Sequence, residues 1–245
     1  MSFEFSSVLG KVYIVGAGPG DADLLTLKAY KILKEADVIL YDRLIGEDIV
    51  KMIKDLGKKA IYVGKEKGEK SSIRQMEINK LMKKYAERGK TVVRLKGGDP
   101  LIFGRLAEEI EFLIKNGIPF EVIPGVSSVN GVPAYANIPL THPEFGLFVV
   151  VLSGRESARL NEVLKFSTFV VLMAGSSAKN IAQNMINAGM DPKTSVAIIQ
   201  RGTMSNQKVR FFSLDELSKS NFNFEMPAMM IVGKVVELAR DLQKL

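Results

Sequence analysis

Short apolar runs alternate with longer amphipathic segments along the first half of the chain. Five runs rich in β-branched residues predict strands at residues 12–15, 38–41, 60–63, 91–95 and 120–123. Between them, apolar residues recur at helical spacing and predict helices at residues 24–36, 47–54, 74–88 and 105–116. Because alternating strands and helices are typical of βαβ crossovers, we expect a mostly parallel sheet in this half.

The second half of the chain follows a different pattern. Prolines and small residues become frequent after residue 124, so we place a domain boundary there, with domains at residues 1–125 and 126–245. Strands are predicted at residues 147–152, 168–173, 196–200, 208–212 and 229–232, and helices at 178–188, 214–219 and 236–245. The turn-like segment 201–207 between two of these strands indicates a hairpin, and hence a mixed sheet. The predicted fold class is therefore α/β, with two α/β domains.

The composition is that of an ordinary globular protein with an excess of basic residues. Hydrophobic residues make up 47% of the 245 and charged residues 25%, and the first ten residues lack a signal-peptide pattern. No apolar run approaches the ~20 residues of a membrane span, so we expect no membrane partner. The absence of cysteine excludes disulfides and thiolate metal sites and fits a cytoplasmic protein, and we predict no metal.

The net charge of +7 has two interpretations. It favours an anionic partner, which is either nucleic acid or a metabolite that carries carboxylates or phosphates. Alternatively, the extra lysines and arginines only solvate helix faces.

Unusual residues gather where the predicted parallel strands end. In such sheets the carboxyl ends of the strands share one edge, and ligands bind there. The loops at these ends are residues 16–21, 42–43, 64–65, 97–100 and 124–128. Their shared edge is the main argument from the residues themselves for a binding site.

The first of these loops has the glycine spacing of a dinucleotide-binding turn. However, Asp21 stands at the last glycine position, where it would repel a pyrophosphate. Pro19 also removes one amide donor. We therefore expect the ligand at this loop to be something other than a diphosphate.

Single residues in these loops have both a chemical and a purely structural interpretation. Asp42 is placed to take a proton, with Arg43 orienting it or holding an acidic substrate group, or else the two form a surface ion pair. Asp99 can accept hydrogen bonds from a ligand or cap the next helix. Lys65 is distinguished from an ordinary solvated lysine only by its place on the same edge. His142 is the single histidine and has no second metal ligand to support it.

Seven motifs follow one another from about residue 11 to residue 238. They are Val-Gly-Ala-Gly-Pro-Gly-Asp at 15–21 with Leu-Leu-Thr-Leu-Lys at 24–28, Ala-Asp-Val at 36–38 with Tyr-Asp-Arg-Leu at 41–44, Val-Gly-Lys at 63–65, Val-Arg-Leu-Lys-Gly-Gly-Asp-Pro at 93–100 with Ile-Phe-Gly-Arg at 102–105, Pro-Gly-Val-Ser-Ser at 124–128, Ile-Pro-Leu-Thr-His at 138–142, and Pro-Ala-Met-Met-Ile-Val-Gly at 227–233. Together and in this order they resemble the tetrapyrrole methylase family. Within the family, the Tyr-Asp-Arg-Leu and Gly-Lys pieces are similar to the branch that acts on uroporphyrinogen III.

The resemblance implies a fold, a cofactor and a reaction. The fold would be two α/β domains with S-adenosylmethionine in the cleft between them, and the protein would form a homodimer. The reaction would methylate the anionic tetrapyrrole uroporphyrinogen III at C2 and C7, giving precorrin-2 through precorrin-1. That product feeds siroheme and cobalamin-type tetrapyrroles.

The resemblance also assigns roles to residues. Asp42 would be the proton acceptor and Lys65 the proton donor, while Arg43, Arg105 and His142 would bind the substrate. The positions that would contact the cofactor are Pro19, Gly97, Gly98, Asp99, Ile102, Ser127, Ser128, Met173, Gly202 and Ala228.

The chain departs from the family pattern on the expected substrate side, at Glu66, Lys70, Pro143 and Arg155. A sister methylase of the same fold, acting on a later corrin intermediate or on a protein side chain, therefore stays an alternative. A basic nucleotide- or RNA-binding module is a third hypothesis. Against it, the chain shows no basic stripe with interleaved stacking aromatics and contains no tryptophan, so we expect no nucleic-acid partner.

Overall fold

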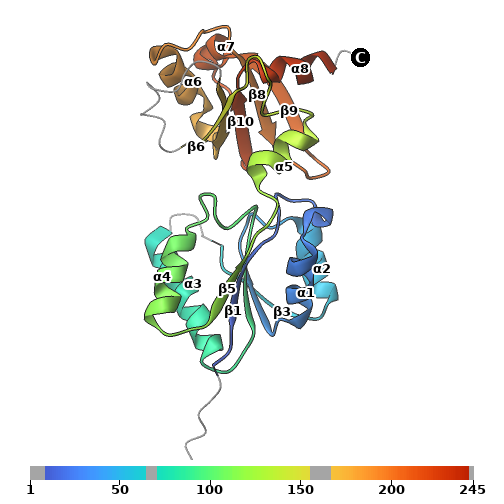
Figure 1. Ribbon diagram of the computed structural model, residues 1–245, viewed down its shortest axis with the longest axis vertical. Helices are drawn as coiled ribbons and strands as arrows, with labels where there is room; N and C mark the ends of the chain where they lie inside the picture. Colours follow the sequence, from blue (N-terminus) through green and yellow to red (C-terminus); the bar gives the residue numbers. More distant parts are fainter. Residues whose placement is uncertain (1–8, 65–70, 155–166, 243–245) are drawn as a thin grey trace, which may run out of the picture. The chain divides into compact units, whose positions relative to one another are not determined.

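The computed structural model describes residues 9–64, 71–154 and 167–242. Packing divides the chain into two compact units, Met1–Ser127 and Ser128–Leu245. Each unit is built on its own five-stranded sheet, which confirms the predicted α/β fold class with two sheets (Figure 1). The domain boundary expected after residue 125 stays a prediction.

The sheet of the N-terminal unit is parallel throughout. Its strands are β1 (Val12–Gly16), β2 (Val38–Tyr41), β3 (Lys59–Tyr62), β4 (Val92–Lys96) and β5 (Phe120–Ile123). They are ordered β3-β2-β4-β1-β5, and in the central register Val15 lies opposite Leu95 of β4 and Ile123 of β5. The predicted parallel sheet is thus confirmed. Because the strands all run the same way, the loops after them leave from one edge.

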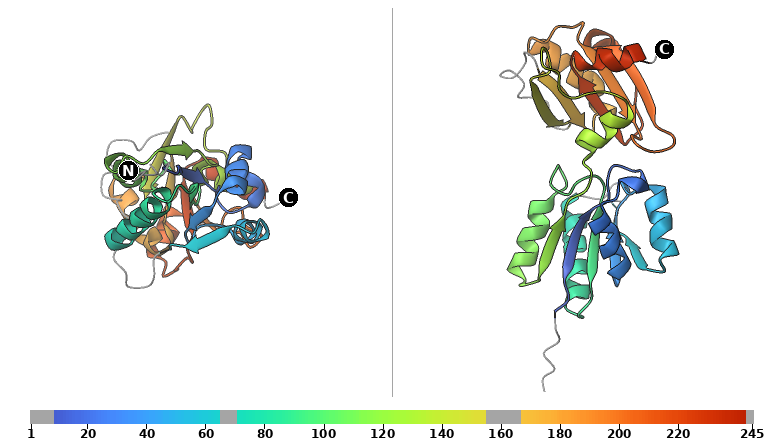
Figure 2. Two further views of the ribbon diagram at one scale, coloured as in Figure 1. Left: turned by 90° about the horizontal axis from the view of Figure 1, so that it is seen from below. Right: turned by 45° about the vertical axis from the view of Figure 1, so that its right-hand side comes forward.

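Two pairs of helices cover this sheet, one pair on each face (Figures 1 and 2). One pair is α1 (Leu27–Glu35) and α2 (Glu47–Asp55). Their residues Leu33 and Ile49 pack on the face of the sheet to which Val93 belongs. The other pair, α3 (Ser71–Ala86) and α4 (Leu106–Lys115), packs Met82 and Leu113 on the strand residues that include Val92. Neighbouring positions along a strand therefore face different helix pairs.

The first helix begins later than predicted, because two caps divide the segment. Asp21 caps the short 3₁₀ helix η1 (Ala22–Leu24), accepting from the Asp23 amide at 2.9 Å. The hydroxyl of Thr26 then accepts from the Ala29 amide at 3.1 Å and starts α1. Asp21, which spoils the dinucleotide pattern, is thus a helix cap.

The C-terminal unit has the mixed sheet that the predicted hairpin required. Its strands are β6 (Phe148–Ser153), β7 (Ser167–Leu172), β8 (Ser195–Gln200), β9 (Lys208–Ser213) and β10 (Ala228–Val232), in the order β6-β7-β10-β8-β9. Strands β6 and β7 are parallel, and the other neighbouring pairs are antiparallel. Strand β10 thus begins at the edge where β7 and β8 end.

Helices also cover both faces of this second sheet. The short η2 (Gly175–Ser177) leads into α6 (Ala178–Asn187), which packs with α7 (Leu214–Lys219) on one face; α5 (Ser128–Tyr135) and α8 (Val235–Leu242) share the core of the other. Helix α5 was not predicted, because its small residues and Pro133 are typical of a loop. Its residues Val132 and Pro133 are buried, and the packing of Val132 in the core overrides the local preference.

Within the described residues, no helix combines the length and the apolar content that crossing a membrane requires.

Candidate active site

The loops after β1 and β4 are joined by a pair of backbone hydrogen bonds. The amide of Gly98 donates to the carbonyl of Gly18 at 2.7 Å, and the amide of Gly18 donates to the carbonyl of Gly98 at 3.2 Å. Both residues have positive φ, 77° at Gly18 and 68° at Gly98, a conformation that glycine adopts without steric cost. The two glycine-rich loops therefore form one structure at the sheet edge.

The loop after β5 approaches this structure too closely for side chains. A Cβ at Gly16 would lie 2.5 Å from the nitrogen of Gly125 and 2.7 Å from the carbonyl oxygen of Gly98. A Cβ at Gly125 would lie 2.5 Å from that same oxygen. Three loops that are far apart in the sequence thus meet through their main chains, so any ligand at their edge meets backbone groups as well as side chains.

Asp99 connects two of these loops. Its Oδ1 accepts from the Leu101 amide at 2.8 Å, and its Oδ2 accepts from the Gly125 amide at 3.0 Å. The carboxylate therefore has a structural role at the edge. A carboxylate oxygen has capacity for a second hydrogen bond, so its predicted contact with a ligand is compatible with this role.

The loop between β4 and α4 exposes apolar side chains on a strained backbone. Leu101, Ile102 and Phe103 are all exposed. Phe103 and Arg105 have φ of 51° and 56°. A non-glycine residue in this conformation costs about 1–3 kcal/mol, and such residues are found mostly at active sites and ligand-binding loops. The guanidinium of Arg105 donates through Nε to Oε1 of Glu108 at 2.7 Å, which lowers the pKa of Glu108.

Asp42 lies directly after β2, and its partner is not the one that the sequence indicated. Its Oδ1 accepts from the Leu44 amide at 3.0 Å, and its Oδ2 accepts from Nη2 of Arg94 at 2.9 Å. Arg43 is exposed, so the residue that orients Asp42 is Arg94 of β4. The predicted proton donor Lys65 lies outside the described residues, as do Glu66, Lys70 and Arg155.

Beneath this edge lies a buried group of charges that the sequence analysis missed. Arg94, Lys96 and Glu109 are 4%, 5% and 0% exposed. Oε1 of Glu109 accepts from Nε of Arg94 at 3.2 Å and from Nε2 of Gln75 at 3.1 Å, and Oε2 accepts from Nζ of Lys96 at 2.8 Å. Burial lowers the pKa of Lys96, and the nearby Arg94 lowers it further.

A signal for this group exists in the sequence. Arg94 and Lys96 stand two positions apart in β4, and Val92 of the same alternate set packs against α3 and α4. Two cations on one helix-covered face of a central strand require buried anionic partners. The pattern could therefore have indicated a buried carboxylate on one of these helices.

A second group of predicted residues meets at one edge of the C-terminal sheet. The amide of Ala174 donates to the carbonyl of Ala228 at 3.1 Å, and the amide of Arg201 donates to the carbonyl of Pro227 at 2.9 Å. These bonds bring together Met173 after β7, Gly202 after β8 and Ala228 at the start of β10.

The backbone at this edge is also strained. Met173, Arg201 and Thr203 have φ of 59°, 51° and 70°. A Cβ at Gly202 would lie 2.4 Å from Cγ1 of Val132, so Gly202 packs directly on α5, the helix that begins at Ser128. Strain, close packing and three predicted cofactor positions thus coincide here.

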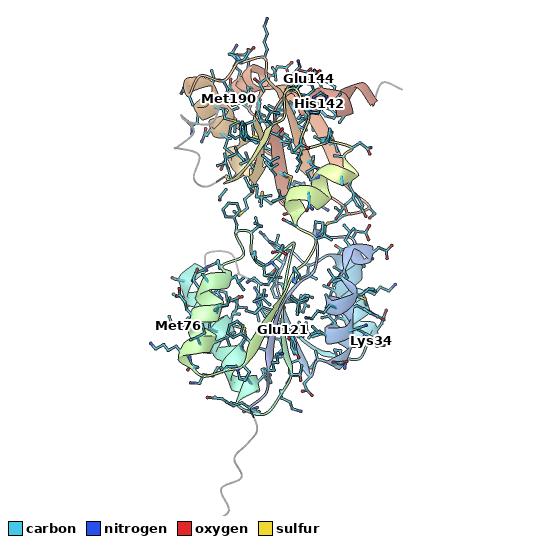
Figure 3. All side chains as sticks on the ribbon, viewed as in Figure 1. Lys34, Met76, Glu121, His142, Glu144 and Met190 are labelled. Carbon is cyan, nitrogen blue, oxygen red and sulfur yellow. The ribbon has the colours of Figure 1, made fainter. Side chains whose placement is uncertain are left out.

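His142 lies elsewhere in this unit, near the end opposite to α5 (Figure 3). Its ring stacks on Phe145 with 3.7 Å between centroids, and its Nδ1 accepts from the Glu144 amide at 3.2 Å. Phe145 in turn lies under Nζ of Lys234, just past the carboxyl end of β10. The structure therefore does not bring His142 together with Met173, and its substrate role stays a prediction.

The described residues offer no cluster of three or more histidine, cysteine, aspartate or glutamate side chains that could hold a metal ion. Residues 11–218 match the model of the tetrapyrrole (corrin/porphyrin) methylases. The chain belongs to this family. The resemblance drawn from the sequence motifs is thereby confirmed.

The methylase is similar to several named bacterial proteins over nearly its whole length. It is 43% identical to the uroporphyrinogen-III C-methyltransferase of Bacillus subtilis (strain 168), covering 96% of this chain and 94% of that protein. It is 41% identical to the siroheme synthase of Hydrogenovibrio crunogenus, covering 96% of this chain but 51% of that protein. The methylase thus spans about half the length of the siroheme synthases that it matches.

A solved structure agrees with the sequence matches. The uroporphyrin-III C-methyl transferase from Thermus thermophilus, complexed with S-adenyl homocysteine, has a TM-score of 0.79 and 36% identity, with 94% of each chain covered. The N-terminal and C-terminal folds described above are therefore those of a tetrapyrrole methylase.

Proposed function

We propose that this methylase transfers methyl groups from S-adenosylmethionine to uroporphyrinogen III, at C2 and then C7. The product would be precorrin-2, formed through precorrin-1, which supplies siroheme and cobalamin-type tetrapyrroles. The observation that carries the proposal is the 43% identity to a B. subtilis protein named for this activity, over 94% of that protein.

The residues of the two edges fit the methyl donor. S-adenosylmethionine carries a sulfonium and no phosphate, which agrees with a glycine loop in which Pro19 and Asp21 leave no phosphate cradle. When bound, it supplies an electrophilic methyl group. The residues proposed to bind it are Pro19, Gly97, Gly98, Asp99, Ile102, Ser127, Ser128, Met173, Gly202 and Ala228.

The protein must also align the substrate and manage its protons. A reduced pyrrole carbon is electron-rich, so holding it in line with the methyl group is the main requirement. We assign Asp42 as the group that accepts the ring proton; its carboxylate already accepts a hydrogen bond from Arg94 at 2.9 Å. We assign Lys65 as the group that donates a proton.

The substrate has eight carboxylates, which favours a basic edge. Arg43 follows Asp42 at the carboxyl edge of the N-terminal sheet, and Arg105 ends the loop after β4. We propose both as substrate-binding residues. His142 rests on the resemblance alone.

A homodimer in the cytoplasm completes the proposal. The family resemblance supports the homodimer, and the absence of cysteine fits the cytoplasm. Size-exclusion chromatography with light scattering tests the dimer, because a monomer at working concentration would contradict it.

The reaction is tested with purified protein, uroporphyrinogen III and ¹³C-methyl S-adenosylmethionine under anaerobic conditions. We expect a product with two labelled methyl groups, which NMR places on C2 and C7. If a protein that binds the donor leaves uroporphyrinogen III unmethylated, the alternative is favoured, namely a sister methylase that acts on a later corrin intermediate or on a protein side chain. Tight, steeply salt-dependent binding of RNA would instead favour the nucleic-acid hypothesis.

A further inference from the structure

One carboxylate beneath the N-terminal edge has no part in the proposed reaction, although it is completely buried. Glu109 lies in the first turn of α4 and is 0% exposed. It accepts hydrogen bonds from three side chains, those of Arg94, Lys96 and Gln75. Burying a carboxylate costs free energy that only such partners offset.

The Arg94 guanidinium is held at each of its three nitrogens. Nε donates to Glu109 at 3.2 Å, Nη1 donates to the carbonyl of Leu95 at 2.9 Å, and Nη2 donates to Asp42 at 2.9 Å. Because the group is planar and rigid, fixing Nε and Nη1 also fixes the direction in which Nη2 points. Glu109 and the β4 backbone thus determine where Arg94 meets Asp42.

The charges of this group balance. Arg94 and Lys96 contribute two positive charges, and Glu109 and Asp42 contribute two negative ones. A group of this kind is often no more stable than well-packed apolar side chains, so stability alone is a weak reason for its presence. Its outermost member is Asp42, the residue proposed to take the proton.

We infer that Glu109 is a positioning residue, which holds the Arg94 guanidinium so that Arg94 fixes the carboxylate of Asp42 in its reactive place. This inference rests on the proposed function of Asp42. Shifting a catalytic group by about 1 Å can lower turnover by about 10²-fold. Glu109 therefore acts on turnover while touching neither substrate nor cofactor.

The test removes the Glu109 anchor without leaving an uncompensated charge. In the double variant Lys96→Met with Glu109→Met, one cation and one anion are lost together, so the Arg94–Asp42 pair stays neutral overall, and Nε of Arg94 loses its carboxylate acceptor. Glu109→Asp is a second variant, which keeps the charge and withdraws the anchor by one methylene. Gln75→Met is the matched control, because it removes a different hydrogen bond to Glu109 and leaves both carboxylate contacts of Arg94.

For the double variant we expect kcat to fall by about 10²-fold, while KM for uroporphyrinogen III and Kd for S-adenosylmethionine stay within about twofold. Glu109→Asp should show a smaller fall in kcat with the same constant KM, and Gln75→Met should keep wild-type kcat. Circular dichroism and donor binding by calorimetry establish that each variant is folded.

A folded double variant with wild-type kcat would overturn the inference, and so would a Gln75→Met variant that loses as much kcat as the double variant. If the double variant does not fold, Glu109→Asp decides by its kcat in the same way. The wild-type protein is assayed in parallel: no methylated product from it would contradict the proposed function, whereas normal wild-type turnover beside unaltered variants contradicts only the role of Glu109.

Discussion

The amide of Gly125 donates to Oδ2 of Asp99 across 3.0 Å, and this bond ties the loop after β5 to the loop after β4. The second carboxylate oxygen accepts from the Leu101 amide at 2.8 Å. One side chain therefore orders two loops that the proposed cofactor site uses.

Asp99→Ala should loosen both loops. Two backbone amides would lose their acceptor, and we expect stability to fall by about 1–3 kcal/mol. We also expect weaker binding of S-adenosylmethionine, because the cofactor would have to order the loops itself. Urea denaturation and calorimetry measure the two effects. Asp99→Asn keeps one acceptor oxygen, so its stability and its donor affinity should lie between those of wild type and Asp99→Ala. Wild-type affinity in Asp99→Ala would show that donor binding does not need these two hydrogen bonds.

Gly16→Ala should be more damaging than an ordinary glycine substitution. Its Cβ would lie 2.5 Å from the nitrogen of Gly125, so the backbones at the edge must separate. Gly117→Ala is the control, since Gly117 has φ of 63° and no atom within 4 Å of its added Cβ. The control should lose only about 1–2 kcal/mol of stability, which is the cost of placing an alanine in the left-handed conformation, and its cofactor affinity should not change. Equal loss of affinity in both variants would contradict a specific role for the close approach.

The hydrophobic pattern was enough to predict the strands and most of the helices. Short apolar runs rich in β-branched residues located the strands of both sheets, most clearly for central strands such as β4, which is buried at every position. Helix α5 was not predicted, because it is stabilised by the packing of Val132 and other residues in the core, which local helix propensity does not describe. Parallel order then followed from the alternation of elements, and with it the single edge at which the loops gather.

Long-range partners were harder to predict than positions. The sequence predicted that Asp42 follows a strand at the edge and offered its neighbour Arg43 as one possible partner, whereas the partner in the structure is Arg94, 52 residues away. No spacing rule connects residues that meet only through sheet order.

Glu121 provides a prediction about pH. It accepts from Nζ of Lys11 at 2.7 Å and of Lys28 at 2.5 Å, and these bonds lower the pKa of Glu121 to about 2. A carboxyl with a lowered folded-state pKa stabilises the protein above its unfolded pKa, and the contribution is lost as pH falls through the folded pKa.

The Tm difference between wild type and Glu121→Gln should therefore be constant above pH 4.5 and disappear towards pH 2. Thermal unfolding at a series of pH values measures it. The pairs are solvent-exposed, so the difference should be small and should shrink in high salt. Glu111→Gln, at an exposed position of α4, is the control and should show no such pH dependence. A difference that grows below pH 4 would have the wrong sign for this mechanism.

Asp42→Asn should separate binding from turnover. The amide oxygen still accepts from the Leu44 amide, but the group no longer takes a proton and no longer neutralises Arg94. We expect kcat to fall by about 10²–10⁴-fold while S-adenosylmethionine affinity stays near wild type. Asp48→Asn, at an exposed position in the first turn of α2, is the control. A wild-type rate in Asp42→Asn would remove Asp42 from the mechanism.

The contact between Gly202 and Val132 offers a test by compensation. A Cβ at Gly202 would lie 2.4 Å from Cγ1 and 2.6 Å from Cγ2 of Val132, so Gly202→Ala overpacks this point and should cost about 1–3 kcal/mol. Because the clash is with a side chain, Val132→Ala removes the two nearest methyl groups and leaves only the Cβ at position 132, at 2.9 Å, as a close contact. The double variant should therefore be less destabilised than the sum of the single variants, with a coupling of about 0.5–3 kcal/mol.

Donor affinity should follow the same cycle. Gly202 adjoins Arg201 and Thr203, whose backbone is strained, so pushing α5 away would disturb the edge that carries Met173 and Ala228. We expect Gly202→Ala to weaken S-adenosylmethionine binding and the added Val132→Ala to restore part of it, as measured by calorimetry. If stability is recovered but affinity is not, then Gly202 meets the cofactor directly, since an added methyl there would block the ligand however much room α5 leaves.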